Sequence, residues 1–263
     1  MIDVQNQPDE RQWPIDHVGV RDLRYPIVVL DRAHGRQQTI ARISVSVSLP
    51  HHFKGTHMSR FLEVLHEHHG EMMTIRTLPA ILERLKERLE AERARLEVRF
   101  LYFLEKEVSV SRARSLMDYE CYFAGELAGG AAEFALGVVV PVTSVCPCSK
   151  AISDYGAHNQ RGFLTIEVTG GGTGPDDFIW IEEVVAIGEK AGSAPIYPLL
   201  KRADERHVTM QAYDNPVFVE DMVRSVAVAL EADRRVRKFR VLAENDESIH
   251  THKAFAEIRW TRA

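Results

Sequence analysis

Apolar and polar residues alternate along several stretches of the chain, and this two-residue period predicts β-strands. The clearest stretch is 39–49, where four apolar side chains from Ile43 to Leu49 point one way and three serines point the other. Pro50 ends this strand, because proline lacks the N–H that a sheet requires. Further strands are predicted at 98–110, 116–127, 132–145, 163–169, 236–243 and 253–260.

Other stretches repeat their apolar residues every three or four positions, as an amphipathic helix does. The strongest begins at Leu78 and ends at Leu89, with Thr77 in the N-cap position. In the last predicted helix, Asn215 is placed as the cap and Pro216 in the first turn. The remaining periodic segments predict helices at 56–69, 177–190, 197–210 and 215–231.

The order of these elements is similar in the two halves of the chain. Each half reads as a strand pair, then helices, then a second strand pair, although no strict sequence repeat occurs. Residues 1–20 contain Pro8 and Pro14 and read as a flexible N-terminal arm. The pattern therefore predicts an α+β protein.

Composition narrows the class of protein. The chain has 263 residues, enough for one large domain or two small ones, and 45% hydrophobic with 27% charged residues is typical of a globular protein. A net charge of -5 gives no sign of a nucleic-acid surface, and no apolar run reaches the roughly 18 residues that span a bilayer. The N-terminus is not a signal peptide, and three cysteines do not make a disulfide framework. We therefore expect a reduced, cytoplasmic protein with no nucleic-acid or membrane partner.

The segment 141–162 carries the most chemistry. Cys146 and Cys148 are one residue apart behind an apolar strand, and in an extended segment such residues face the same side. His158 follows twelve residues after Cys146, and thiolate and imidazole groups are ligands for zinc and similar metals. A lone cysteine is usually a small buried hydrophobe, which is our interpretation of Cys121. The polar loop after the pair instead favours an open metal site.

Further candidates lie in the second half. Glu205 by itself reads as a solvated charge. Glu220 lies at the edge of the apolar stripe of the last helix, where a carboxylate is partly desolvated, although an ion pair with Arg224 explains it equally well. His250 and His252 alternate and share one face, as residues of a plain hydrophilic hairpin loop also do.

Four basic residues are candidates for binding a triphosphate. Lys150 and Arg161 belong to the cysteine segment, and His57 and Arg60 lie where a helix opens and its free N–H groups attract anions. No Walker-type or dinucleotide-binding glycine loop occurs in the sequence.

Three segments together resemble the type IB GTP cyclohydrolases: 141–162, 18–26 and the Glu-Ser-Ile-His-x-His pattern at 247–252. The resemblance implies a tunnelling fold with two tandem ββααββ-like units, 21–130 and 131–263. In this fold antiparallel sheets backed by helices join into oligomeric barrels, which leaves no open sheet edge. The resemblance also implies active sites at subunit interfaces, and we expect a homotetramer.

The resemblance implies that the protein converts GTP to 7,8-dihydroneopterin triphosphate and formate, the first step towards tetrahydrofolate. Such a reaction needs a metal, a general acid/base and a purine anchor; the metal is left open between Mn²⁺, Zn²⁺ and Fe²⁺. The roles that the resemblance assigns are Cys146, His158 and Glu205 for the metal, Cys146, Cys148 and His250 for catalysis, and Glu220, Lys150, Arg161, His57, Arg60, His252 and Glu247 for the substrate.

Two alternatives stay open. An archaeal relative opens the same ring but yields a 2',3'-cyclic phosphate. A protein on the same fold can also hold a metal in a closed site for stability and bind ligands without turnover.

Overall fold

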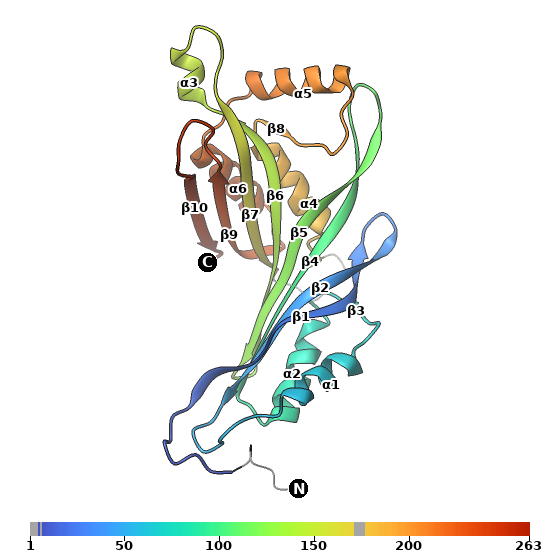
Figure 1. The fold of residues 1–263 in the computed structure, drawn as a ribbon, viewed down its shortest axis with the longest axis vertical. Helices are drawn as coiled ribbons and strands as arrows, with labels where there is room; N and C mark the ends of the chain where they lie inside the picture. Colours follow the sequence, from blue (N-terminus) through green and yellow to red (C-terminus); the bar gives the residue numbers. More distant parts are fainter. Residues whose placement is uncertain (1–4, 6, 171–176) are drawn as a thin grey trace. The chain divides into compact units, whose positions relative to one another are not determined.

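The computed structural model describes residue 5 and residues 7–170 and 177–263, which form a mixed α+β structure (Figure 1). Backbone contacts divide it into two compact units. One holds the chain up to Leu101 together with Tyr122–Leu136, and the other holds Tyr102–Cys121 and Gly137–Ala263. The long strands β4, β5 and β6 therefore each contribute residues to both units.

The first unit contains three antiparallel strands that pair in the order β1, β2, β4, and a short β3 that runs parallel to β1. Its helices α1 and α2 contact each other, as Figure 1 shows. The bounds are β1 (Ile15–Asp31), β2 (Gly35–Leu49), α1 (Met58–Glu67), β3 (Met72–Met73), α2 (Leu78–Leu89) and β4 (Arg93–Glu107).

The patterns at 39–49 and 78–89 are confirmed. In β2 the apolar residues from Ile43 to Leu49 are buried, and in α2 the buried residues form the predicted stripe. Thr77 stands at the N-cap of α2, but its side chain does not cap the helix. Its hydroxyl instead donates to the Met72 carbonyl oxygen at 2.9 Å, which fastens β3 to the helix start.

Strand β1 was not predicted. It begins at Ile15, inside the segment expected to be an arm, of which residues 1–4 and 6 lie outside the described part. The register with β2 shifts twice, once between Val20 and Leu23, and Asp22 has a φ of 57°. Such a bulge breaks the two-residue period that sequence reasoning relies on.

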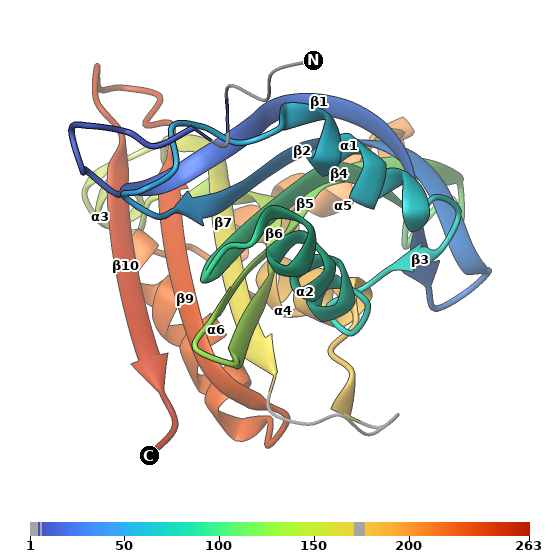
Figure 2. The ribbon, with the colours of Figure 1, turned by 90° about the horizontal axis from the view of Figure 1, so that it is seen from below.

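The second unit has a sheet with helices on one face. Helix α6 packs on β9 and β10, and α4 packs beside α6 (Figure 2). Hydrogen bonding between the described strands follows the order β10–β9–β7–β6–β5–β4–β2–β1–β3, with β8 on β6. The bounds are β5 (Arg114–Ala128), β6 (Ala131–Val145), α3 (Pro147–Ile152), β7 (Asn159–Gly170), α4 (Ile181–Ala191), β8 (Ala194–Pro195), α5 (Arg202–Asp214), α6 (Val219–Ala232), β9 (Val236–Asn245) and β10 (Ala254–Thr261).

The predicted start of the last helix is wrong by four residues. Asn215 ends α5 instead of capping α6, and its side-chain amide donates to the carbonyl oxygens of Gly192 and Ser193. Helix α6 starts at Val219, where the Asp221 carboxylate accepts the Phe218 N–H at 3.1 Å. The apolar stripe itself is buried as predicted.

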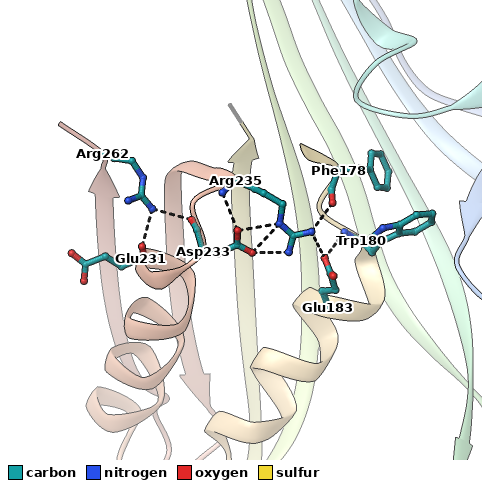
Figure 3. Close-up of polar contacts among 7 residues, drawn as sticks. All are labelled: Phe178, Trp180, Glu183, Glu231, Asp233, Arg235 and Arg262. Atoms are coloured by element: carbon teal, nitrogen blue, oxygen red, sulfur yellow. Dashed lines mark hydrogen bonds and ion pairs between the residues drawn. The ribbon is translucent and has the colours of Figure 1, made fainter. Parts of the chain in front are cut away.

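Arg235, immediately before β9, joins the sheet to the helix layer (Figure 3). Its guanidinium donates to the Phe178 carbonyl oxygen at 2.8 Å and pairs with Glu183 at 3.0 Å and Asp233 at 2.6 Å. Arg262, after β10, donates to the Asp233 carbonyl oxygen at 2.9 Å. The start of β9 is therefore held by charge-assisted hydrogen bonds.

No helix in the described residues is long and apolar enough to cross a membrane.

Candidate active site

Two connections of the second unit meet at one end of its sheet. The β6–β7 connection contains α3, and the β9–β10 loop lies at the same end (Figure 1). The Asp246 N–H donates to the Arg161 carbonyl oxygen at 3.0 Å, which joins the loop to the start of β7. The segment 141–162, which carries the two cysteines, therefore lies beside the β9–β10 loop, which carries His250 and His252.

Cys146 and His158 are neighbours in space. The Cys146 N–H donates to the His158 carbonyl oxygen at 3.1 Å. Cys146 is the N-cap of α3, and its sulfur accepts the Ser149 N–H at 3.4 Å.

The expected extended geometry of the cysteine pair is wrong. Pro147 starts α3, so Cys148 stands in a helical turn instead of a strand. Cys146 is half-buried, whereas Cys148 is exposed. Cys146 is held in place through its N–H and its sulfur.

The His158 ring is largely buried, with 13% of its side chain exposed. Its Nδ1 lies 2.9 Å from Gln160 Oε1 and 3.8 Å from Glu247 Oε2. The His158 N–H donates to the Ser149 hydroxyl at 3.1 Å. With Nδ1 engaged, Nε2 is the ring nitrogen that remains for a ligand.

Glu205 is exposed in the first turn of α5. Val208 and Ala212, three and seven residues later, pack with Val145 and Ala157, the neighbours of Cys146 and His158 in the chain. Residues at this spacing share one helix face, so Glu205 belongs to the face of α5 that packs on the chain neighbours of Cys146 and His158.

The adjacent Asp204 has a structural role. It is buried, and its carboxylate accepts from the Ser111 hydroxyl at 2.6 Å and from the Lys201 N–H at 3.0 Å. The Ser111 hydrogen bond lowers the pKa of Asp204. The buried acid therefore fixes the start of α5 and leaves Glu205 on the surface.

The donors fit a divalent metal by their chemistry. Thiolate, imidazole and carboxylate groups together suit zinc, manganese or iron. Cys146 and His158 are hydrogen-bonded through their backbones, and α5 packs through Val208 and Ala212 on the adjacent residues Val145 and Ala157. Within the described residues, however, no three His, Cys, Asp or Glu side chains converge as a ready metal cluster.

Glu220 lies in the first turn of α6, where a negative charge is favoured by the helix dipole. It is exposed, so the expected partial burial is wrong for the single chain. Arg224, the alternative partner, forms its ion pair with Asp221 at 3.5 Å. The Val217 N–H donates to the Val145 carbonyl oxygen at 3.1 Å, which brings the start of α6 to the cysteine segment.

His250 and His252 are exposed in the β9–β10 loop, and their rings stack with centroids 5.0 Å apart. The loop is fixed by the His250 N–H to the Glu247 carbonyl oxygen at 3.4 Å and by a Lys253–Asp246 ion pair at 2.9 Å. Both imidazole rings are therefore accessible from solvent.

The basic candidates have different surroundings. The Lys150 ammonium donates to the Tyr213 carbonyl oxygen and lies 4.2 Å from the centre of the Tyr213 ring, which joins α3 to the end of α5. Arg161 is exposed at the start of β7. His57 and Arg60 belong to the first unit, where Arg60 donates to the Arg88 carbonyl oxygen at 3.1 Å.

Sequence reasoning gave no role to three buried polar residues of this site: Ser144, Gln160 and Asn245. A signal was present in the pattern. Ser144 continues the inward-facing positions of the valines in β6, and Gln160 and Asn245 do the same in β7 and β9. A polar residue in register with buried ones needs a hydrogen-bonding partner and therefore marks a network.

A family model described as type I GTP cyclohydrolase folE2 matches residues 1–256. The chain belongs to this family. A relative from Nitrosococcus oceani named "GTP cyclohydrolase FolE2" is 52% identical over 256 residues, covering 97% of this chain and 94% of that protein. One from Citrifermentans bemidjiense with the same name is 53% identical over 262 residues, covering 100% and 96%. The resemblance read from the sequence is confirmed.

Solved structures with the same fold include uricases. The uricase from Arthrobacter globiformis aligns with a TM-score of 0.57 and 11% identity, covering 94% of this chain and 93% of that one. Urate oxidase from Bacillus sp. TB-90 aligns with a TM-score of 0.57 and 9% identity, covering 94% and 100%. At such identity the likeness concerns the fold alone, and it supports the expected tunnelling fold.

Proposed function

We propose that this protein is a metal-dependent GTP cyclohydrolase that converts GTP to 7,8-dihydroneopterin triphosphate and formate at the start of tetrahydrofolate synthesis. The proposal rests above all on the backbone hydrogen bond between Cys146 and His158, which makes a helix-capping cysteine and a histidine engaged through Nδ1 neighbours in space. Membership of the cyclohydrolase family supplies the reaction.

Cys146, His158 and Glu205 would hold the metal. A divalent ion held by these donors would lower the pKa of a water molecule for attack on C8 of the guanine. The donor set suits manganese, zinc or iron, because it mixes a soft thiolate with imidazole and carboxylate. The half-burial of Cys146 and His158 restricts water to the exposed side of the site.

Other side chains bind the substrate and move protons. Glu220 accepts hydrogen bonds from the N–H edge of the guanine, which two parallel charge-assisted bonds would orient. Cys148 and His250 supply a proton to the ring nitrogen that is released when the imidazole ring opens. His252 and Glu247 position the substrate. Lys150, Arg161, His57 and Arg60 are the proposed triphosphate contacts.

The exposure of Glu220, Glu205 and His250 in the single chain supports a site completed by a second copy. We infer two tandem tunnelling-fold units, 21–130 and 131–263, and a homotetramer whose sheets join into barrels. The outer edge of β10 carries the exposed Phe255 and no proline, so it is free to pair with another strand. We place the enzyme in the cytoplasm with its substrate GTP.

The first experiment measures metal content and GTP turnover of the purified protein. The wild type should form a fluorescent pterin, and mass spectrometry should give the linear triphosphate and formate. Cys146→Ala should abolish turnover and lower the bound metal. Wild-type rate and metal content in this variant would refute the site, and a cyclic phosphate product would assign the protein to the alternative reaction.

The second experiment tests the shared site by mixing two inactive variants. Cys146 and Glu220 lie on neighbouring segments of one chain, so the second variant is taken from the first unit: His57→Ala. If each site combines His57 of one copy with Cys146 of another, co-refolded variants should recover about a quarter of the activity. No recovery, or a monomeric mass by light scattering with full activity, contradicts the arrangement.

A further inference from the structure

A buried polar network lies directly behind His158. Ser144, Gln160 and Asn245 are 0%, 8% and 2% exposed at the ends of β6, β7 and β9. Apolar residues precede or follow each of them at the same inward-facing positions. Burying a polar group costs free energy unless it is hydrogen-bonded, so the hydrogen bonds of these three side chains determine how they are oriented.

The Ser144 hydroxyl is the centre of this network. Its Oγ lies 3.3 Å from the Val217 carbonyl oxygen, 3.2 Å from Gln160 Nε2 and 3.0 Å from Asn245 Nδ2. A carbonyl oxygen only accepts, so the one hydroxyl proton goes to Val217 and the serine oxygen accepts from both amides. The NH₂ of Gln160 is therefore directed to Ser144, and its Oε1 is directed to His158.

The orientation of Gln160 determines the tautomer of His158. Gln160 Oε1 lies 2.9 Å from His158 Nδ1 and can only accept, so Nδ1 carries the hydrogen. The Glu247 carboxylate, 3.8 Å from the same nitrogen, favours the same tautomer. In a neutral imidazole the other nitrogen, Nε2, then keeps its lone pair.

We propose that Gln160, oriented by Ser144, is a positioning residue that holds His158 as the Nδ1–H tautomer and presents Nε2 to the divalent metal. The inference rests on the metal-dependent function proposed above. Hydrogen bonds to the far nitrogen of a ligating histidine fix its orientation, and their loss typically lowers metal affinity about 10- to 100-fold.

Gly162 leaves space for the side chain of Asn245 in this network. It is the cross-strand partner of Asn245, whose side chain passes over it to reach Ser144 on the next strand. A Cβ at 162 would lie 2.6 Å from Asn245 Oδ1, so a side chain there would block the path. This Oδ1 has no hydrogen-bond partner among the described residues, whereas the NH₂ of the same side chain donates to Ser144.

The tautomer can be tested in the metal-free, full-length protein labelled with ¹⁵N-histidine. A long-range ¹H–¹⁵N spectrum, with His158 assigned from its loss in His158→Asn, should show the Nδ1–H form. Gln160→Leu should give a mixture of tautomers, whereas Gln160→Glu keeps an acceptor and should retain the wild-type form. An Nε2–H tautomer in the wild type, or no change in Gln160→Leu, overturns the proposal.

Metal affinity is the second readout, measured with Zn²⁺ alone against a chromophoric chelator. Ser144→Ala and Gln160→Leu should each weaken binding about tenfold or more, and Gln160→Glu should weaken it less. Wild-type affinity in Gln160→Leu with normal GTP turnover of the wild type refutes this inference but not the function. Absent GTP turnover by the wild type, with the expected tautomer and Zn²⁺ results, refutes the function instead.

Ser193→Ala is the matched control. Ser193 is 1% exposed, and its hydroxyl accepts the Val145 N–H at 3.0 Å, so its loss loosens the same strand end without touching His158. The control should melt earlier and yet keep the wild-type tautomer and Zn²⁺ affinity. Equal losses of Zn²⁺ affinity in Ser193→Ala and Ser144→Ala would show that the network contributes only through general packing, and this would overturn the proposal.

Discussion

The two ends of β9 carry opposite kinds of polar structure. Before its first residue, Arg235 is paired with Asp233 and Glu183 and donates to a backbone carbonyl (Figure 3). At its last residue, Asn245, the amide oxygen is buried and has no hydrogen-bond partner in the described part of the chain, and the loop that follows leaves His250 exposed. At one end the charges are paired within the chain, whereas the other end keeps an unpartnered buried amide oxygen and an exposed histidine loop.

The polar groups at one end of β9 therefore serve stability, and those at the other end serve binding. A group that is fully paired within the chain contributes to folding and has nothing left to bind. Groups that remain unpaired weaken the fold slightly and are available to a metal, a substrate or a second copy. Substitutions at the Arg235 end should therefore change unfolding alone, and substitutions at the Asn245 end should change binding alone.

The largest stability effect is expected for Arg235→Leu. The substitution removes the cation that pairs with Asp233 and Glu183. Their carboxylates are about three-quarters buried, so we expect the free energy of unfolding to fall by about 2–3 kcal/mol. Urea unfolding at fixed protein concentration measures it. Turnover per folded molecule should stay at the wild-type value, and a fall would show that the two ends are coupled.

At the other end, Glu220→Gln should weaken GTP binding about tenfold or more, because charge-assisted hydrogen bonds to the guanine edge are lost. The melting temperature should not change, since Glu220 is exposed. Glu231→Gln, an exposed glutamate at the far end of the same helix, is the control and should bind GTP normally. An unchanged affinity in Glu220→Gln would leave the residue a surface charge.

Most of the fold follows from the sequence, because burial imposes a period on each element. The stripes of α2 and α6 and the alternation in β2 are read directly. Strand β1 was missed because a bulge at Asp22 interrupts the alternation. The start of α6 was missed because its cap comes from Asp221, inside the helix, and not from the preceding Asn215.

The site was predictable only where residue types and their spacing carry the signal. Cys146 and His158 were found together because the chain carries both in one loop. Gln160 belongs to the same segment, but its role was missed because it depends on hydrogen bonds to His158 and to Ser144 on the neighbouring strand, which spacing does not reveal. The exposure of Glu220 likewise depends on how α6 packs, which its sequence pattern does not reveal.

Measuring the free energy of unfolding at several pH values tests the charge interactions of Asp233 at the Arg235 end of β9. The Arg235 hydrogen bonds hold its pKa below the ordinary 3.8. A lowered carboxyl pKa contributes stability above pH 3.8, and this contribution is lost as the pH falls through the folded-state pKa. Asp233→Asn should therefore be less stable than the wild type by about 1–2 kcal/mol at pH 7, with the difference vanishing in acid. A difference that persists at low pH would point to packing and not to charge.

The smallest effect is expected for Lys253→Met at the Asn245 end. Lys253 pairs with Asp246, but the two side chains are 56% and 49% exposed, so water and salt screen the pair. Thermal melts should not distinguish this variant from the wild type, at either low or high salt. A loss as large as that of Asp233→Asn would mean that the loop is clamped like the Arg235 end. The exposed histidines would then be fixed surface groups, and the contrast between the two ends of β9 would not hold.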